Sequence, residues 1–165
     1  MKRRLTILTL TTLAAVALIG VVWTAPSPAL AEGATQISGE AVLDEADTCD
    51  SASVSADYAL LMTGDLDGCL YTFVQTQESS PSGTYRETGT ERFVASDGSG
   101  TFETTYRFEA KYEDVDTLSG EIFGRCQHPI VEGSGTGIFL GVSGQLFFKD
   151  EVETGTFFYR GHLLF

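Results

Sequence analysis

The sequence predicts an all-β protein built as a small eight-stranded antiparallel β-barrel. Polar and apolar side chains alternate with a period of two along several stretches, which is typical of strands with one buried and one solvated face. Short segments rich in Gly, Asp, Ser and Pro separate these stretches, and such short links join antiparallel strands because parallel strands need longer crossovers. Eight strands without covering helices can remove their exposed edges by closing into a barrel.

The clearest predicted strand covers residues 99–112. Its expected inward face holds Phe102, Thr104, Tyr106, Phe108, Ala110 and Tyr112, and its outer face holds Glu103, Thr105, Arg107, Glu109 and Lys111. Residues 155–165 repeat the pattern, with Phe157, Tyr159, Leu163 and Phe165 opposite Thr156, Arg160 and His162. Less regular runs predict strands at 36–43, 54–63, 68–78, 84–95, 118–128 and 136–149. The glycines between 133 and 144 predict a bend in the last of these runs.

Residues 1–31 have the features of a secretory signal peptide. Three basic residues precede an apolar run, and a Pro/Ser segment then ends in Ala29-Leu30-Ala31, a small-x-small cleavage site. We therefore expect residues 32–165 to form one β-barrel domain that is secreted to the periplasm or the extracellular space. The length of the apolar run leaves a retained membrane anchor as the alternative.

The charge balance of residues 32–165 excludes several partners. These 134 residues contain all 23 acidic side chains but only seven of the ten basic ones, which gives a net charge of −16. Nucleic acid and, once the signal peptide is removed, anionic membranes are excluded because both are bound by clustered Lys and Arg. No cofactor or metal is expected, since there is no CxxC pair, the chain has two histidines, and the acidic clusters complete no calcium-binding loop.

All three cysteines lie in the exported part, where disulfides form and persist. An odd number allows one bridge and leaves one thiol over. Cys69 and Cys126 each lie close to a glycine within a predicted strand, whereas Cys49 lies in an acidic segment. The favoured disulfide is therefore Cys69–Cys126, with Cys49–Cys69 as the alternative.

Part of the chain resembles the plant allene oxide cyclases. Residues 102–108, Phe-Glu-Thr-Thr-Tyr-Arg-Phe, resemble that family's strand Phe-Glu-Ala-Thr-Tyr-x-Phe. Residues 133–146 resemble its glycine-rich stretch Gly-Gly-Ser-Gly-x-Phe-x-Gly-Ala-x-Gly-x-Val, which dirigent proteins share in a related form, and residues 157–161 resemble its last strand. The resemblance covers about residues 99–162 and implies an allene oxide cyclase-like or calycin-like barrel. Lipocalins and avidin-like barrels match less well, because residues 32–165 contain no tryptophan.

The resemblance also carries functional implications. Allene oxide cyclases bind an unsaturated fatty-acid epoxide inside the barrel and cyclise it, with a carboxylate of the first strand near the reacting end. Glu40 is the only acid in the predicted first strand and is a candidate for that catalytic role, although the motif around it does not match. The alternative is a solvated strand glutamate. The resemblance further implies a homo-oligomer such as a trimer.

Two sets of residues are candidates for a site. The inward aromatic residues form the expected wall for an apolar ligand, with ordinary core packing as the alternative; they are Phe102, Tyr106, Phe108, Phe157 and Tyr159. His128 lies close in sequence to an arginine, a glutamine and a thiol, and is a candidate catalytic residue that handles a proton. The alternative for His128 is a strand-end histidine beside a disulfide.

Two hypotheses for the function follow from these observations. In the first, a secreted barrel binds a small hydrophobic molecule and either only holds it or acts as an isomerase or cyclase. In the second, a non-catalytic barrel is filled to its centre and acts as a structural or protein-interaction module. A cavity of roughly 300 Å³ or more would favour the first hypothesis, and interlocked Phe and Tyr rings would favour the second.

Overall fold

The computed structural model describes residues 33–165, so the predicted signal peptide lies outside the described residues. Eight strands and two short 3₁₀ helices follow one another along the chain: β1 (Thr35–Leu43), η1 (Ser51–Val54), β2 (Tyr58–Gly64), β3 (Gly68–Ser79), β4 (Thr84–Ala95), β5 (Thr101–Asp114), β6 (Ser119–Pro129), η2 (Gly137–Phe139), β7 (Ser143–Glu151) and β8 (Thr156–Leu164). None of the helices in this part of the chain has the length and apolar character that crossing a membrane requires.

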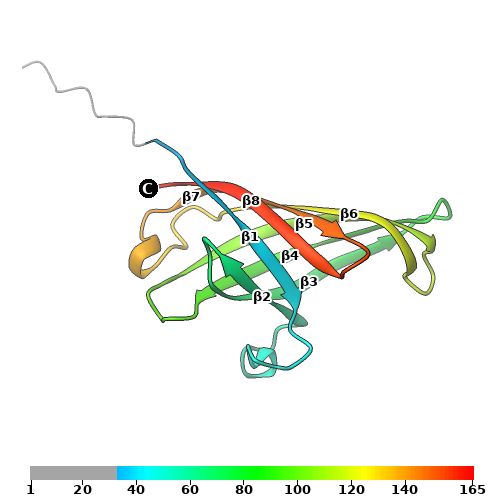
Figure 1. The fold of residues 1–165 in the computed structure, drawn as a ribbon, viewed down its shortest axis with the longest axis horizontal. Helices are drawn as coiled ribbons and strands as arrows, with labels where there is room; N and C mark the ends of the chain where they lie inside the picture. The colour runs from blue at the N-terminus through cyan, green and yellow to red at the C-terminus, as the bar shows by residue number, and fades with distance from the viewer. Residues whose placement is uncertain (1–32) are drawn as a thin grey trace, which may run out of the picture. The chain divides into compact units, whose positions relative to one another are not determined.

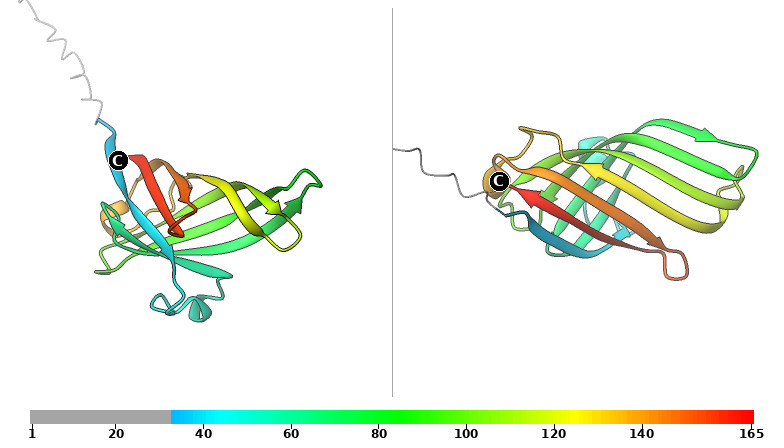
Figure 2. Two further views of the ribbon diagram at one scale, coloured as in Figure 1. Left: turned by 45° about the vertical axis from the view of Figure 1, so that its right-hand side comes forward. Right: turned by 90° about the horizontal axis from the view of Figure 1, so that it is seen from above.

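The eight strands form a closed antiparallel barrel in sequence order (Figure 1). Each strand pairs with its neighbour in the chain, and β1 closes the sheet by pairing with β8 over a register that includes Ala41 opposite Phe157. Figure 2 shows β8 between β1 and β7 from two further directions. Closure satisfies the backbone groups that an open sheet would leave at its edges. The structure confirms the predicted fold class.

The alternation of β5 is confirmed. Phe102, Thr104, Tyr106 and Ala110 are buried, and Phe108 and Tyr112 on the same face are half-buried. The same period continues on β4, where an inward face is formed by Tyr85, Glu87, Gly89, Glu91, Phe93 and Ala95. The barrel interior therefore receives acidic side chains as well as aromatic ones.

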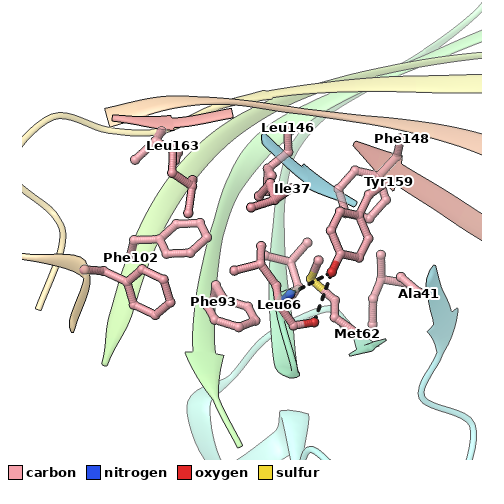
Figure 3. Packing of buried hydrophobic residues seen from close by; sticks show 14 of the residues in the cluster. Ile37, Ala41, Met62, Leu66, Phe93, Phe102, Leu146, Phe148, Tyr159 and Leu163 are labelled. Atoms are coloured by element: carbon pink, nitrogen blue, oxygen red, sulfur yellow. Dashed lines mark hydrogen bonds between the residues drawn. The ribbon is translucent and has the colours of Figure 1, made fainter. Parts of the chain in front are cut away.

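Side chains fill one end of the barrel, the closed end, where β1 begins and β8 ends. The rings of Phe93 and Phe102 stack with centroids 5.0 Å apart, and Phe139 meets both rings edge-on at 5.8 and 5.1 Å. Figure 3 shows Phe93 and Phe102 among the other buried residues at this end. Stacked and edge-to-face pairs are the arrangements that aromatic rings prefer in protein cores.

The glycine-rich segment supplies Phe139, and here the predicted strand at 136–149 is wrong in its first half. Residues 137–139 form η2, and β7 begins only at Ser143. Gly137 and Gly141 have φ angles of +58° and +82°, which lie outside the extended region of a regular strand. The glycines therefore allow a tight turn that covers the closed end, whereas a bend within a strand was expected.

The Tyr159 hydroxyl anchors the β2–β3 turn at the closed end. It accepts a hydrogen bond from the backbone N–H of Leu66 at 2.8 Å and lies within donating distance of the Leu66 carbonyl (Figure 3). The Thr63 carbonyl lies within donating distance of the same hydroxyl. Gly39 makes room for this contact, because a Cβ at that position would overlap the Tyr159 ring and the Thr63 carbonyl. A buried hydroxyl with these partners is a structural group of the core.

The disulfide joins Cys49 and Cys69, so the favoured pairing of Cys69 with Cys126 is wrong and the alternative is correct. Cys69 lies between the inward-facing Gly68 and Leu70 and therefore faces outward, whereas Cys126 is buried on the inward face of β6 with a free thiol. The two side chains lie on opposite sides of the barrel wall. The bridge instead joins the link between β1 and β2 to the outer side of β3. In that link η1 ends at Val54, and the strand predicted at 54–63 begins only at Tyr58.

Candidate functional site

The other end of the barrel, the open end, contains a cavity of about 440 Å³. Its walls come from all eight strands and the β5–β6 turn: Leu43, Tyr58, Leu60, Gln77, Tyr85, Glu87, Glu91, Tyr106, Phe108, Tyr112, Leu118, Glu121, Cys126, His128, Phe148, Asp150 and Phe157. Leu43 and Leu118 are exposed at the strand ends, so the cavity reaches solvent at this end. Its volume lies within the range of small-molecule sites in proteins.

His128 and Glu91 form the most deeply buried polar group of the cavity wall. The His128 Nδ1 lies 2.6 Å from the Glu91 Oε2, and the two residues are 2% and 3% exposed. Thr104 donates its hydroxyl hydrogen to the same Glu91 oxygen at 2.6 Å. Tyr106 and Phe148 lie on either side of the imidazole, with ring centroids at 6.2 and 4.4 Å. Packing and hydrogen bonding together fix the ring orientation.

The far nitrogen of His128 is available for chemistry. An ionised Glu91 carboxylate accepts a hydrogen bond from the Nδ1–H group of His128. The Nε2 atom of the ring is then free to accept a proton or a hydrogen bond from another molecule. Nε2 is buried and has no hydrogen-bond partner among residues 33–165. A carboxylate that orients a histidine in this way is the arrangement that general acid–base catalysis uses.

Three tyrosines donate hydrogen bonds to the carboxylate of Glu87. Its Oε1 accepts hydrogen bonds from Tyr106 at 2.7 Å and Tyr58 at 3.2 Å, and its Oε2 accepts from Tyr85 at 2.5 Å and Gln77 at 3.0 Å. Four donors occupy the acceptor sites of an ionised carboxylate. Burial, followed by the hydrogen bond to Glu87, raises the pKa of both Tyr85 and Tyr106, so these phenols stay protonated.

Asp150 and Glu121 bring a second pair of acids into the cavity. Both carboxyls lie over Gly124, where any Cβ would overlap them. Both oxygens of Asp150 are buried without a hydrogen-bond partner in the described part of the chain. Burial, and then the neighbouring Glu121 carboxyl, raises the pKa of Asp150 to about 8. Asp150 is therefore mainly protonated at neutral pH and can donate a hydrogen bond to a ligand.

The predicted site residues divide between the two ends of the barrel. Tyr106, Phe108 and Phe157 line the cavity, whereas Phe102 and Tyr159 belong to the packed core. Glu40 is exposed on the outer face of β1 and lies outside the cavity.

The catalytic candidate His128 lies in the cavity wall, and its neighbour Cys126 carries a free thiol and no disulfide. Burial, followed by the charges of Glu91 and Asp150, raises the pKa of this thiol, which makes it a poor nucleophile.

The acids of the cavity were missed by the sequence interpretation. Glu87 and Glu91 share the inward face of β4 with Tyr85 and Phe93, and Asp150 shares the inward face of β7 with Phe148. The same period of two therefore identifies these acids as inward-facing. Within residues 33–165, no group of three or more His, Cys, Asp or Glu side chains is arranged to hold a metal ion.

No protein-family model, curated protein or solved structure matches this chain. The resemblance to allene oxide cyclases therefore remains a prediction from the quoted motifs.

Proposed function

We propose that this protein is a secreted barrel that binds a small, largely apolar molecule at its open end, where His128 and Asp150 present buried polar atoms to it. The observation that carries the proposal is the 440 Å³ cavity, in which aromatic walls surround buried polar atoms without partners. Apolar walls with a few convergent polar groups are typical of small-molecule sites. The disulfide supports secretion, since such bonds persist in oxidising compartments.

The same site supports isomerase or cyclase chemistry on the bound molecule. His128 Nε2 would take a proton from one atom and return it to another, and the protonated Asp150 would donate a hydrogen bond to an oxygen that gains charge. Such a rearrangement consumes no co-reactant. The surrounding rings keep water from the reacting atoms.

Native mass spectrometry of the protein exported in oxidised form tests the binding proposal. We expect a bound mass that is lost on denaturation, or uptake of neutral apolar probes such as octanol into the purified protein. His128→Gln keeps a hydrogen-bond donor for Glu91 and is expected to weaken binding by about tenfold, the value of one hydrogen bond. His162→Gln, a half-buried residue on the outer face of β8, is the matched control. Equal affinities of the two variants would place the ligand elsewhere.

A second candidate function rests on the outer face of β6, β7 and β8. Phe123, Phe147 and Phe158 are 47%, 38% and 45% exposed there and line a surface groove of about 570 Å³. Three of the seven basic residues of the exported chain lie in the same groove: Arg125, Lys149 and Arg160. A basic, aromatic face on an acidic protein matches the acidic surface of a second copy, which favours a homo-oligomer.

Light scattering during size exclusion tests this self-association. Phe147→Ser with Phe158→Ser is expected to convert an oligomer to a monomer, and salt is expected to shift the equilibrium in the same direction. Ile138→Ser, at an exposed position of η2, is the control. A wild-type protein that is monomeric at high concentration would rule this candidate out.

A further inference from the structure

The charged groups of the cavity are all of one sign except for a single histidine. Its lining includes four carboxyl groups and His128, but no Lys or Arg; the four are Glu87, Glu91, Glu121 and Asp150. The strand alternation places the basic residues of β4 to β8 on the outer faces of their strands. A ligand that enters the barrel therefore meets negative charge without a lysine or arginine to balance it.

The protein neutralises only part of this charge. The single histidine of the lining is paired with Glu91, with 2.6 Å between the His128 Nδ1 and the Glu91 Oε2. Glu87 receives four hydrogen bonds from neutral donors, which stabilise its charge but supply no opposite charge. Asp150 and Glu121 share a site, and burial followed by the neighbouring Glu121 carboxyl raises the pKa of Asp150 to about 8. No lysine or arginine of the lining lies beside Glu87 or beside the Asp150 and Glu121 carboxyls.

An anionic head group is therefore a poor match for the cavity. Like charges repel strongly where burial lowers the effective dielectric constant, and a carboxylate ligand would also lack a cationic partner. This excludes free fatty acids as preferred occupants, in contrast to the ligand class that the allene oxide cyclase resemblance implies.

The aromatic walls favour a positive charge. Tyr85 lies edge-on to Phe108 and Tyr112 with ring centroids 6.2 and 6.3 Å apart, and the Tyr58 and Tyr106 rings complete the wall beside Glu87. The faces of such rings attract cations, most strongly where water is excluded. Asp150 is 9% exposed, and neither of its carboxyl oxygens has a partner within residues 33–165. It is an acceptor that a bound cation would satisfy.

From this geometry we propose that the cavity selects a cationic ligand, a small organic amine or quaternary ammonium compound whose apolar part lies along the aromatic wall and whose charge lies beside Asp150 and Glu121. The inference rests on the proposed function, since it names the charge class of the molecule bound in the same cavity. Loss of the Asp150 proton on binding would complete the ion pair, so binding at pH 7 releases protons to the buffer.

Three probes with the same eight-carbon chain separate charge from apolar burial: octyltrimethylammonium, octanol and octanoate. Isothermal titration of the oxidised protein at pH 7.5 is expected to give an affinity at least about tenfold higher for the cation than for octanol, with octanoate the weakest. Octanol bound as tightly as the cation, or octanoate bound more tightly, would overturn the inference and leave the proposed function standing. Failure of all three probes to bind up to millimolar concentration would overturn both.

Two variants locate the cation. Asp150→Asn and Glu121→Gln each keep a side chain that can hydrogen-bond to octanol, and each is expected to reduce the preference for the cation over octanol by about tenfold. Glu103→Gln, on the exposed outer face of β5, removes the same charge from the protein without touching the cavity and is the matched control. A preference that persists in both cavity variants, or that falls equally in the control, would contradict the assignment. Because octanol binding reports an intact cavity, misfolding of a variant is recognised directly.

Discussion

The Nδ1 atom of His128 and the Oε2 atom of Glu91 lie 2.6 Å apart in the barrel interior, on strands that are not neighbours in the sheet. β5 lies between the two strands, and its Thr104 donates a hydrogen bond to the same Glu91 oxygen. Bulk water solvates neither side chain, because each residue is at most 3% exposed. The polar atoms of both side chains therefore depend on protein partners for their hydrogen bonds.

A double-mutant cycle on this pair is expected to show strong coupling. Glu91→Gln and His128→Gln should each destabilise the barrel, because each leaves a buried polar partner unsatisfied. The double variant should lose less than the sum of the two single losses, by about 1–3 kcal/mol. Chemical denaturation monitored by circular dichroism measures all four free energies of unfolding.

The control for the cycle is the surface pair Arg86 and Glu109, with 2.9 Å between Nε and Oε2 and with the Arg86 side chain 47% exposed. Its coupling should be below about 1 kcal/mol, since solvent screens exposed ion pairs. A coupling at the buried pair that is no larger than this value would contradict the role assigned to the pair.

The pH dependence of stability should report Asp150. Burial and then Glu121 raise the pKa of Asp150 from 3.8 to about 8, so the folded state holds its proton over a range where the unfolded state has lost it. Stability from this group is therefore fully present below about pH 4 and falls as the pH rises toward 8. The titratable groups around it from neighbouring strands are Glu121 and Cys126 on β6, Tyr112 on β5 and Glu87 on β4.

Asp150→Asn isolates this contribution. Thermal unfolding between pH 5 and pH 9 should show the variant gaining on the wild type as the pH rises, by roughly 1–3 kcal/mol at the upper end after allowance for partial solvent access. Glu153→Gln, on the exposed β7–β8 turn, should leave the pH profile unchanged. Parallel profiles for the wild type and Asp150→Asn would show that Asp150 titrates normally.

The strand periodicity predicted the barrel and most of its inward faces, because alternation is a local property of each strand. The residues of β5 and β8 show this, since Tyr106 and Phe157 reach the cavity as expected. The position of a side chain along the barrel axis, in the cavity or in the packed core, depends on segments far away in the sequence. Phe102 and Tyr159 share those faces but lie in the packed core, because η2 and the β2–β3 turn cover that end.

The acids of the site show a different difficulty. Glu87 and Glu91 follow the inward period of β4, but a buried glutamate is acceptable only when partners reach it from other strands. Those partners, Tyr106 on β5 and His128 on β6, become neighbours only when the barrel closes. The disulfide was mistaken for the same reason: which side of the wall a cysteine faces depends on the inward face of its strand.

The Cys49–Cys69 bridge should stabilise the protein without being required for the barrel. It closes a loop of 20 residues in sequence separation, for which restriction of the unfolded chain gives about 3 kcal/mol. Cys49→Ser combined with Cys69→Ser should lower the free energy of unfolding by about this amount while leaving the circular dichroism of the sheet unchanged. Thiol titration of the oxidised wild type should find one group, Cys126, and only in denaturant, because that thiol is buried. Three reactive thiols in denaturant, or a Cys69–Cys126 peptide after digestion, would contradict the assignment.

The Tyr159 hydroxyl should contribute stability at the closed end and leave the cavity unaffected. Tyr159→Phe removes the acceptor for the Leu66 N–H and the donor that lies 3.0 Å from the Thr63 carbonyl and 3.1 Å from the Leu66 carbonyl. Leaving these buried backbone groups without a partner costs about 1–3 kcal/mol, which lowers the melting temperature by several degrees. Tyr112→Phe is the matched control, because the Tyr112 hydroxyl makes no hydrogen bond within the described part of the chain and its ring lines the cavity. We expect octanol affinity to stay within twofold in Tyr159→Phe. Equal destabilisation of the two variants would mean that the β2–β3 turn holds its place without the tyrosine, and a loss of octanol binding in Tyr159→Phe alone would move the ligand site toward the closed end.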